Sequence, residues 1–309
     1  MRIDRNQTRS SVGTVLREKP MPIATVAGAS INYEMLEPAG ARLAPLIAAP
    51  AIALSPGSRS PLDEMRQLGT LMAAAGYRVL LHDRRNCGAS DVGFDATRSE
   101  FEMWADDMHE LLGHLGLRPA IIGGSSSGAR LALTYARRYP DAVSALLLMR
   151  ITGGSFAVAR LIEKYFDIHS RAAATGGMAA VCETEHFAEL IANRPHNRDL
   201  LLATKPADFI ACMNVWRGHF LAGVDLPLIG TSEADLRLLT MPVCIIPGND
   251  LTHPRARGAL VKPMISGCEV HYVTHIEHEL DVTPPDEWKA HYPAMASIFA
   301  DFLARRLGA

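Results

Sequence analysis

The strongest constraint on the fold is residues 119–139, where a short apolar run leads into a turn of small residues and then a helix. Residues 124–128 read Gly-Ser-Ser-Ser-Gly and fit the pattern G-x-S-x-G, with Ser126 as the central serine. This pattern marks a strand that turns sharply into a helix, because only small residues avoid clashes in so tight a turn. An apolar stripe at helical spacing and then Pro140 follow, which predicts a helix that ends there.

The same turn presents a side chain used in nucleophilic catalysis. A serine hydroxyl is a weak nucleophile until a histidine takes its proton. A reactive Ser126 therefore requires a histidine, an acid that orients this histidine, and donors for an oxyanion. A turn of glycine and serine is also typical of an ordinary loop, so the rest of the chain must decide between the two interpretations.

Composition and charge exclude several classes of protein. The chain has 309 residues, 48% hydrophobic and 21% charged, which is typical of a soluble globular protein with one large domain and an insertion. The net charge of -2 gives no electrostatic reason to expect nucleic acid or a membrane as partner. The longest apolar stretch, residues 43–54, contains two prolines, and the N-terminus lacks the apolar core of a signal peptide. The five cysteines show neither close pairs nor metal-ligand spacing, so we expect reduced thiols in a cytoplasmic protein.

Strand-like apolar runs and helical patterns alternate along most of the chain. We therefore predict an α/β fold with a mostly parallel central sheet and helices on both faces. In such sheets the functional residues lie in loops at the carboxyl ends of the strands. Residues 1–22 are predicted to form an N-terminal arm, residues 23–150 and 233–309 the sheet core, and residues 151–232 an inserted helical cap.

A second motif strengthens the catalytic interpretation. Residues 82–91 read His-Asp-Arg-Arg-Asn-Cys-Gly-Ala-Ser-Asp, which resembles the D-x-R-G-x-G-x-S loop of the α/β-hydrolase superfamily. Asn86 stands where glycine is usual, and asparagine tolerates a positive φ better than most residues. The resemblance covers about residues 23–150 and 235–307. It implies an α/β-hydrolase fold and a serine esterase-like member with a helical cap, whose triad follows the chain order serine, acid, histidine.

The resemblance also assigns the other members of the triad. Asp250 follows a predicted strand and precedes Pro254 by four residues, as in the family's D-x-x-x-P pattern; its role would be to bind and orient the histidine. Asp225 and Asp235 are weaker rivals.

Three histidines near the last predicted strand are candidates for the base. His278 matches the family's spacing to that strand and to a later proline, and it is the predicted base. His275 is the alternative, and His271 lies within the strand. The remaining histidines, including His253 beside the acid, are expected to be surface or pocket residues.

The resemblance implies two backbone N–H donors for the oxyanion. Ser127 begins a helix directly after the nucleophile, where free N–H groups and the helix dipole favour negative charge. Ser58 follows Gly57 in the loop after an earlier strand. Arg59 would bind an anionic substrate group, although a solvated loop arginine fits equally well. Trp216 belongs to a helical stripe of large apolar residues that would line a pocket or simply pack in the core.

The expected activity is hydrolysis of a carboxylic ester or lactone of a small molecule through an acyl-enzyme, without metal or organic cofactor. Hydrolysis of a carbon–carbon bond in a vinylogous diketone is the alternative within enzymes, because relatives use the same triad for it. A non-catalytic protein that binds a small ligand on the same fold is the alternative outside enzymes. A haloalkane dehalogenase is disfavoured, since its nucleophile would be an aspartate at position 126. A homo-oligomer is possible.

Overall fold

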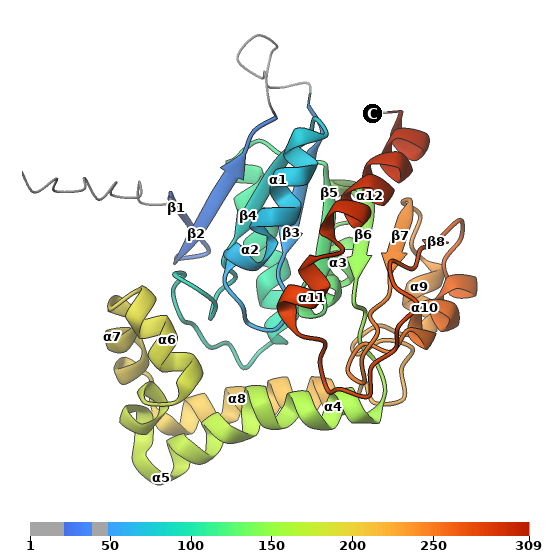
Figure 1. Cartoon of the computed structure of the whole chain (residues 1–309). Coiled ribbons are helices and arrows are strands. Elements are labelled where there is room, and N and C mark those ends of the chain that lie inside the picture. Colours follow the sequence, from blue (N-terminus) through green and yellow to red (C-terminus); the bar gives the residue numbers. More distant parts are fainter. Residues whose placement is uncertain (1–21, 39–48, 309) are drawn as a thin grey trace, which may run out of the picture.

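The structure is a computed structural model that describes residues 22–38 and 49–308. The predicted N-terminal arm therefore lies almost entirely outside the described residues. The centre is an eight-stranded sheet in the order β1-β2-β4-β3-β5-β6-β7-β8, shown in Figure 1. Its strands are β1 (Ile23–Val26), β2 (Ala29–Leu36), β3 (Ala51–Ser55), β4 (Arg78–His82), β5 (Ala120–Ser125), β6 (Val143–Met149), β7 (Val243–Ile246) and β8 (Glu269–Val270). The β1–β2 and β2–β4 pairs are antiparallel and the other pairs are parallel, which confirms the predicted mostly parallel sheet.

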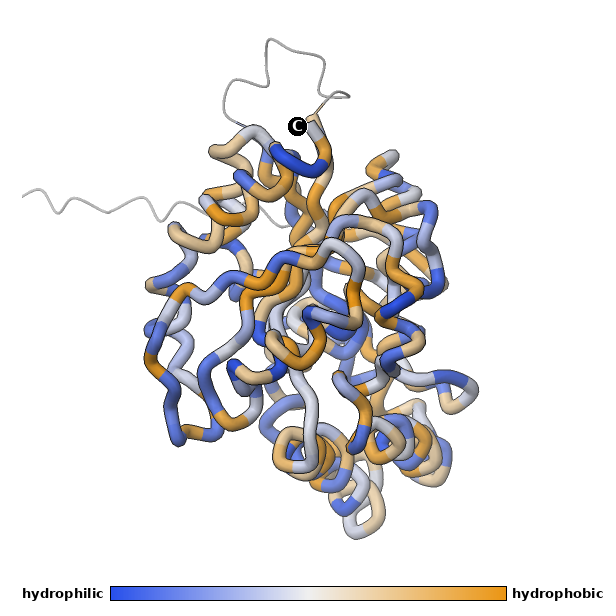
Figure 2. Tube along the Cα trace, turned by 90° about the vertical axis from the view of Figure 1, so that its right-hand side faces the viewer, coloured by the Kyte–Doolittle hydropathy of each residue, from blue (hydrophilic) through white to orange (hydrophobic). Residues whose placement is uncertain are grey.

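Helices cover both faces of this sheet. Helices α1 (Arg66–Ala74) and α12 (Tyr292–Leu307) pack together on one face, and α2 (Glu100–His114) and α3 (Ser127–Arg138) on the other (Figure 1). The alternation within β3 explains this arrangement: Ile52 and Leu54 belong to the core cluster under α1 and α12, whereas Ala53 belongs to the cluster under α2 and α3. A strand buried on both faces reads as a continuous apolar run, and Figure 2 shows the central strands as a largely hydrophobic trace among helices of mixed hydropathy.

Residues 151–232, all of which the structure describes, add no strand to the central sheet. They form α4 (Ser155–Ile162), the π-helical turn η4 (Glu163–Asp167), α5 (Ile168–Cys182), α6 (Glu185–Asn193), α7 (His196–Ala203) and α8 (Pro206–Leu221). Figure 1 places these helices across the lower ends of the strands, between β6 and β7 in the sequence.

The remaining helices are short. They are η2 (Leu62–Met65), η3 (Pro140–Ala142), α9 (Glu233–Arg237), α10 (Ala256–Val261), η5 (Lys262–Met264) and α11 (Pro285–Lys289). Helices α11 and α12 are separate, because Pro293 occupies the first turn of α12 and proline breaks a continuing helix.

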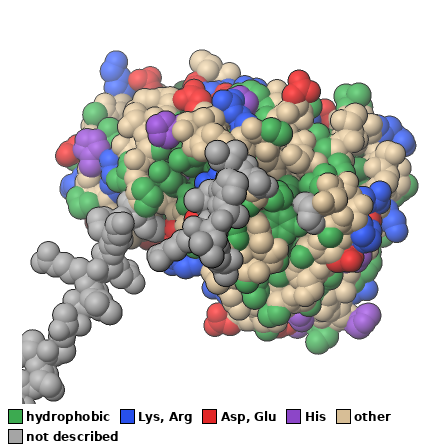
Figure 3. All heavy atoms as spheres, turned by 90° about the horizontal axis from the view of Figure 1, so that it is seen from above, with side chains coloured by type: hydrophobic (Ala, Val, Ile, Leu, Met, Phe, Trp, Pro, Cys, Tyr) green, Lys and Arg blue, Asp and Glu red, His purple; other side chains and the backbone are tan. Residues whose placement is uncertain are grey.

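Charge is dispersed over the face seen from above. Figure 3 shows acidic and basic side chains interspersed there, with no large patch of one sign. All five cysteines are free and buried. Among the described residues, no helix is both long and apolar enough to cross a membrane.

Candidate active site

Ser126 lies alone between β5 and α3, at the sharp turn that the sequence predicts. Its φ of 55° and ψ of -110° are unusual for a residue with a side chain, and such strain is often found at functional sites. Its amide donates a hydrogen bond of 2.9 Å to the carbonyl of Met149. The flanking glycines are required by space: a Cβ at Gly128 would lie 2.2 Å from the carbonyl oxygen of Ser55, and one at Gly124 would lie 2.5 Å from the backbone of Gly128.

The Ser126 side chain faces a histidine and, beyond it, a carboxylate. His253 Nε2 lies 2.9 Å from Ser126 Oγ, and His253 Nδ1 lies 2.8 Å from Asp250 Oδ1. All three side chains belong to buried residues. In this geometry Ser126 donates its hydroxyl proton to Nε2, while the Nδ1–H group donates to the carboxylate. The predicted nucleophile and acid therefore meet at one place.

Asp250 and His253 come from a single turn after β7. The Asp250 carboxylate also accepts a 2.8 Å hydrogen bond from the His253 amide, so that one side chain closes the turn and holds the imidazole. Gly248 makes room for this fold, because a Cβ there would lie 2.4 Å from His253 Cβ. Sequence reasoning missed His253, and the available signal was the spacing of a glycine, the acid and the histidine within residues 248–253.

His278 is not the histidine at Ser126, and this corrects the predicted base. Its Nε2 lies 2.5 Å from Glu287 Oε1, and its amide donates to the carbonyl of Asn249 at 2.7 Å. The physical reason is that β8 ends at Val270 and the following segment contacts the acid loop through its backbone, which leaves the His278 ring outside the site. The alternative, His275, is exposed.

A buried arginine sets the electrostatics of this group. Arg150 Nη2 lies 2.6 Å from Asp250 Oδ2, and the Thr283 amide donates to the same oxygen at 2.9 Å. Burial raises the pKa of the Asp250 carboxyl, but the hydrogen bond from His253 and the charge of Arg150 outweigh burial and hold this pKa below its usual range. For His253, burial first and Arg150 second lower the pKa to about 4, against the opposing pull of Asp250. Near neutral pH the arrangement is thus a neutral imidazole beside an ionised carboxylate.

Hydrogen bonds connect Ser127 and Ser58, the two residues whose amides are predicted to bind the oxyanion. Ser127 Oγ donates to the carbonyl of Ser58, and the buried Arg84 donates both to Ser127 Oγ at 2.9 Å and to the Ser58 carbonyl at 3.0 Å. Ser58 has a φ of 45°, and among the described residues its amide has no acceptor. These contacts hold the loop after β3 against the start of α3.

A cavity of about 240 Å³ opens at Ser126, and a second one, of about 320 Å³, adjoins it. Ser58, Ser60 and Lys164 line both cavities. Ligand sites in proteins are concave and combine apolar walls with a few polar groups. The first cavity fits this description, since Leu161 and Trp288 line it beside the polar side chains.

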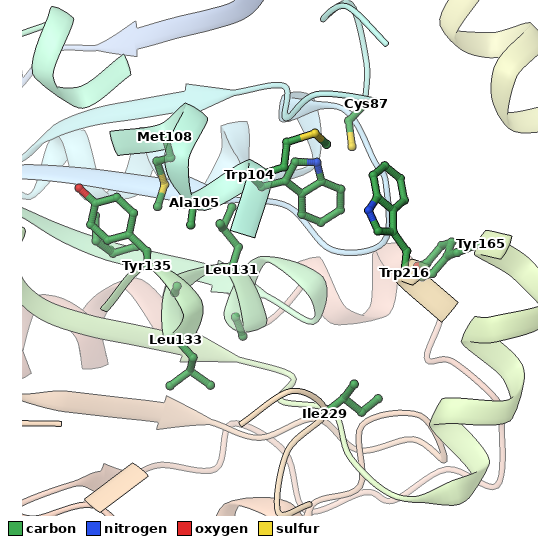
Figure 4. Packing of buried hydrophobic residues seen from close by; sticks show 14 of the residues in the cluster. Cys87, Trp104, Ala105, Met108, Leu131, Leu133, Tyr135, Tyr165, Trp216 and Ile229 are labelled. Atoms are coloured by element: carbon green, nitrogen blue, oxygen red, sulfur yellow. The ribbon is translucent and has the colours of Figure 1, made fainter. Parts of the chain in front are cut away.

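Of the two residues predicted to contact the substrate, Arg59 lines a cavity and Trp216 does not line either of the two cavities near Ser126. Arg59 lines the second cavity, and its Nη2 lies 3.0 Å from Glu100 Oε1 with both side chains buried, so its charge is balanced within the protein. Trp216 lines neither of these two cavities and is buried, so of the two alternatives that the sequence leaves open the structure favours packing in the core over a place in the pocket. Its indole N–H donates to the carbonyl of Arg98 at 3.0 Å, and Figure 4 shows it in the core near Tyr165. Within the described residues, no group of three or more His, Cys, Asp or Glu side chains is arranged to hold a metal ion.

Comparison with known sequences identifies relatives over part of the chain. A family model described as alpha/beta hydrolase fold matches residues 56–176. An uncharacterized hydrolase, YraK of Bacillus subtilis, is 29% identical over 122 residues, which are 40% of this chain and 41% of that protein. The sn-1-specific diacylglycerol lipase ABHD11 of Mus musculus is 34% identical over 96 residues, which are 31% of this chain and 30% of that protein. The chain therefore matches less than half the length of these curated relatives.

Solved structures resemble the chain over nearly its whole length. An enol-lactonase from Burkholderia xenovorans has a TM-score of 0.59 at 19% identity and covers 92% of this chain and 100% of its own. A meta-cleavage product hydrolase from Pseudomonas fluorescens has a TM-score of 0.59 at 17% identity and covers 92% of this chain and 97% of its own. At such identities the similarity shows the fold.

Proposed function

We propose that the chain, whose residues 56–176 match a family model of the alpha/beta hydrolase fold and whose structure shares that fold with solved hydrolases, is a serine hydrolase of the α/β-hydrolase superfamily that cleaves a carboxylic ester or lactone of a small molecule. One observation carries the proposal: the chain of contacts from Ser126 through His253 to Asp250. These residues form the nucleophile, base and orienting acid of a catalytic triad, which is recognised by geometry rather than by sequence position.

The contacts support a two-step reaction. His253 takes the proton of Ser126 Oγ, and the alkoxide attacks the substrate carbonyl. Asp250 stabilises the imidazolium that forms, because its carboxylate faces Nδ1 at 2.8 Å. The oxyanion accepts hydrogen bonds from the amides of Ser127 and Ser58, the expected donors of this site. His253 then protonates the leaving group, and water activated by the same histidine releases the acyl group.

Two substitutions separate the proposed triad from the histidine predicted by sequence. A fluorophosphonate probe is expected to label the wild type and to fail on Ser126→Ala. Hydrolysis of short para-nitrophenyl esters should fall by about a thousandfold or more in His253→Ala. His278→Ala is the matched control and should retain most of the activity, since its ring faces Glu287.

Several results would contradict the proposal. Labelling that survives in Ser126→Ala would remove the serine from the mechanism. A larger loss of esterase activity in His278→Ala than in His253→Ala would identify His278 as the base, as the sequence predicts. Turnover of coloured dienoates without turnover of any ester would replace ester hydrolysis by carbon–carbon bond hydrolysis, and ligand binding without any turnover would indicate a binding protein.

A further inference from the structure

The cavity at Ser126 carries an excess of positive charge. Its lining includes four cationic side chains and one acidic one, namely Arg150, Arg160, Lys164, Lys289 and Glu64. The two arginines are balanced locally, because Arg150 contacts Asp250 at 2.6 Å and Arg160 lies 3.5 Å from Asp281. The two lysines form no ion pair with any residue that the structure describes. Within the cavity at Ser126, no acidic side chain of the lining pairs with either lysine, whereas the second cavity, which Lys164 also lines, carries Glu185 and Glu189.

The acidic residues closest to Lys164 in the sequence are occupied elsewhere. Lys164 lies in η4, between Glu163 and Asp167. Glu163 pairs with Arg171, and Asp167 pairs with Arg217 at 2.8 Å. This pairing occupies the two carboxylates of η4, so that neither forms an ion pair with Lys164.

The backbone of η4 is itself unusual. π-Helical turns are rare and occur mostly as single turns within α-helices, frequently at functional sites. This turn buries Tyr165 and Phe166 and leaves Lys164 exposed at the junction of the two cavities. Lys289, at the end of α11, approaches the first cavity from a different element. Two separate walls thus each supply a lysine to the space around Ser126.

The remaining acid of the lining, Glu64, already has a partner. Its Oε1 accepts a 2.9 Å hydrogen bond from the Gly57 amide, so it supports the loop next to Ser58. Glu64 therefore leaves the lysines free to receive an anion that enters with the substrate.

We propose that the ester or lactone cleaved at Ser126 carries a carboxylate and that Lys164 and Lys289 bind it. This inference rests on the proposed hydrolase function and adds the substrate class to it. Lysine ammonium groups attract a carboxylate as point charges, and a cavity lined by one sign of charge raises the local concentration of the opposite ion. Lys164 and Lys289 thereby determine specificity.

The test compares esters that differ only in charge. One pair carries the group on the acyl side, mono-para-nitrophenyl adipate against the neutral amide para-nitrophenyl adipamate. The other carries it on the leaving group, meta-carboxyphenyl butyrate against meta-carbamoylphenyl butyrate. The variants are Lys164→Met and Lys289→Met, with Lys205→Met as control, because Lys205 is an exposed lysine that lines neither cavity.

The expected readout is the ratio of kcat/KM for the anionic and neutral members of a pair. In at least one pair the wild type should favour the anion by about tenfold or more, and each cavity variant should lower the ratio by about three- to tenfold. The loss should be confined to the anionic ester, so that kcat/KM for the neutral ester changes little in either lysine variant. Lys205→Met should have the same ratio as the wild type. Added salt should reduce the preference, because it screens charges at a partly exposed site.

The outcomes separate this inference from the proposed function. Turnover of the neutral esters that depends on Ser126, with a ratio near one in both pairs, would leave the hydrolase in place and overturn the carboxylate site. A preference that survives in both lysine variants would also overturn it. Binding tests the site without turnover: adipate should bind Ser126→Ala at least tenfold more tightly than adipamide, and equal binding would refute the inference even if no ester is cleaved.

Discussion

At the scale of single residues, Arg150 lowers the pKa of both Asp250 and His253, which favours the charged form of the carboxyl and the neutral form of the imidazole. Its charge helps to keep the Asp250 carboxylate ionised, and it also disfavours a proton on His253. A nearby cation stabilises a carboxylate and destabilises an imidazolium. The result is a base that stays neutral, and hence able to accept the proton of Ser126, well into the acidic range.

The pH profile of the reaction tests this balance. Since the pKa of His253 is lowered to about 4, kcat/KM for a neutral ester should stay high at pH 5 to 6 and decline only as the pH approaches 4. An ordinary histidine would already be half protonated near pH 6.5. Arg150→Met removes a positive charge, so the acidic limb should move to higher pH by about one unit. A wild-type limb near pH 6.5, or a limb that does not move in the variant, would contradict this account.

At the scale of elements, the connection between β5 and α3 is held by backbone contacts that leave no room for a Cβ. The first turn of α3 approaches the end of β3 so closely that Gly128 faces the carbonyl of Ser55. This approach also brings Ser127 next to the carbonyl of Ser58. The strained backbone of Ser126 is therefore fixed from both sides, and the loop that carries Ser58 is fixed with it.

Gly128→Ala should destabilise the protein by about 2–4 kcal/mol, because a Cβ placed 2.2 Å from a backbone oxygen can be relieved only by moving the strand or the helix. Esterase activity should be lost together with stability. Gly218→Ala is the matched control: Gly218 lies within α8, with no atom within 4 Å of its Cβ position. That change should leave activity intact and raise stability by about 0.5–1 kcal/mol. Urea denaturation of the two variants measures the difference, and equal midpoints would show that the contact has no energetic weight.

The turn between β5 and α3 could be predicted from the sequence, whereas the position of the base could not. The turn at Ser126 is local: its glycines, strand and helix are adjacent in the chain, so their pattern alone predicts it. Asn86 is similar, since its φ of 63° fits the expectation for an asparagine in place of glycine. The base is different. Whether His253 or His278 reaches Ser126 depends on how the loop after β7 and the segment after β8 pack on each other. The spacing of Gly248, Asp250 and His253 points to a tight turn, but by itself it does not determine that packing.

At the scale of the whole molecule, three buried histidines and one half-buried histidine are spread over distant parts of the fold. His82 ends β4, His169 and His186 lie in α5 and α6, and His253 lies in the site after β7. Burial is the first cause that lowers the pKa of each of them, to about 3 for His82 and for His169. The folded protein thus excludes protons that these side chains bind readily once the chain unfolds.

Acidification should therefore destabilise the protein before most carboxylates titrate. Between pH 6.5 and about 4 the unfolded state binds more protons than the folded state, so the free energy of unfolding rises with pH and falls on acidification. At pH 5 each such histidine costs about 1–2 kcal/mol. Urea midpoints at pH 7 and pH 5 measure the loss. His82→Gln should reduce the difference between the two midpoints, because His82 is fully buried with neither ring nitrogen hydrogen-bonded among the described residues. His275→Gln, at an exposed position, should not. Equal stability of the wild type at the two pH values would refute the expectation that burial of these histidines governs its response to acid.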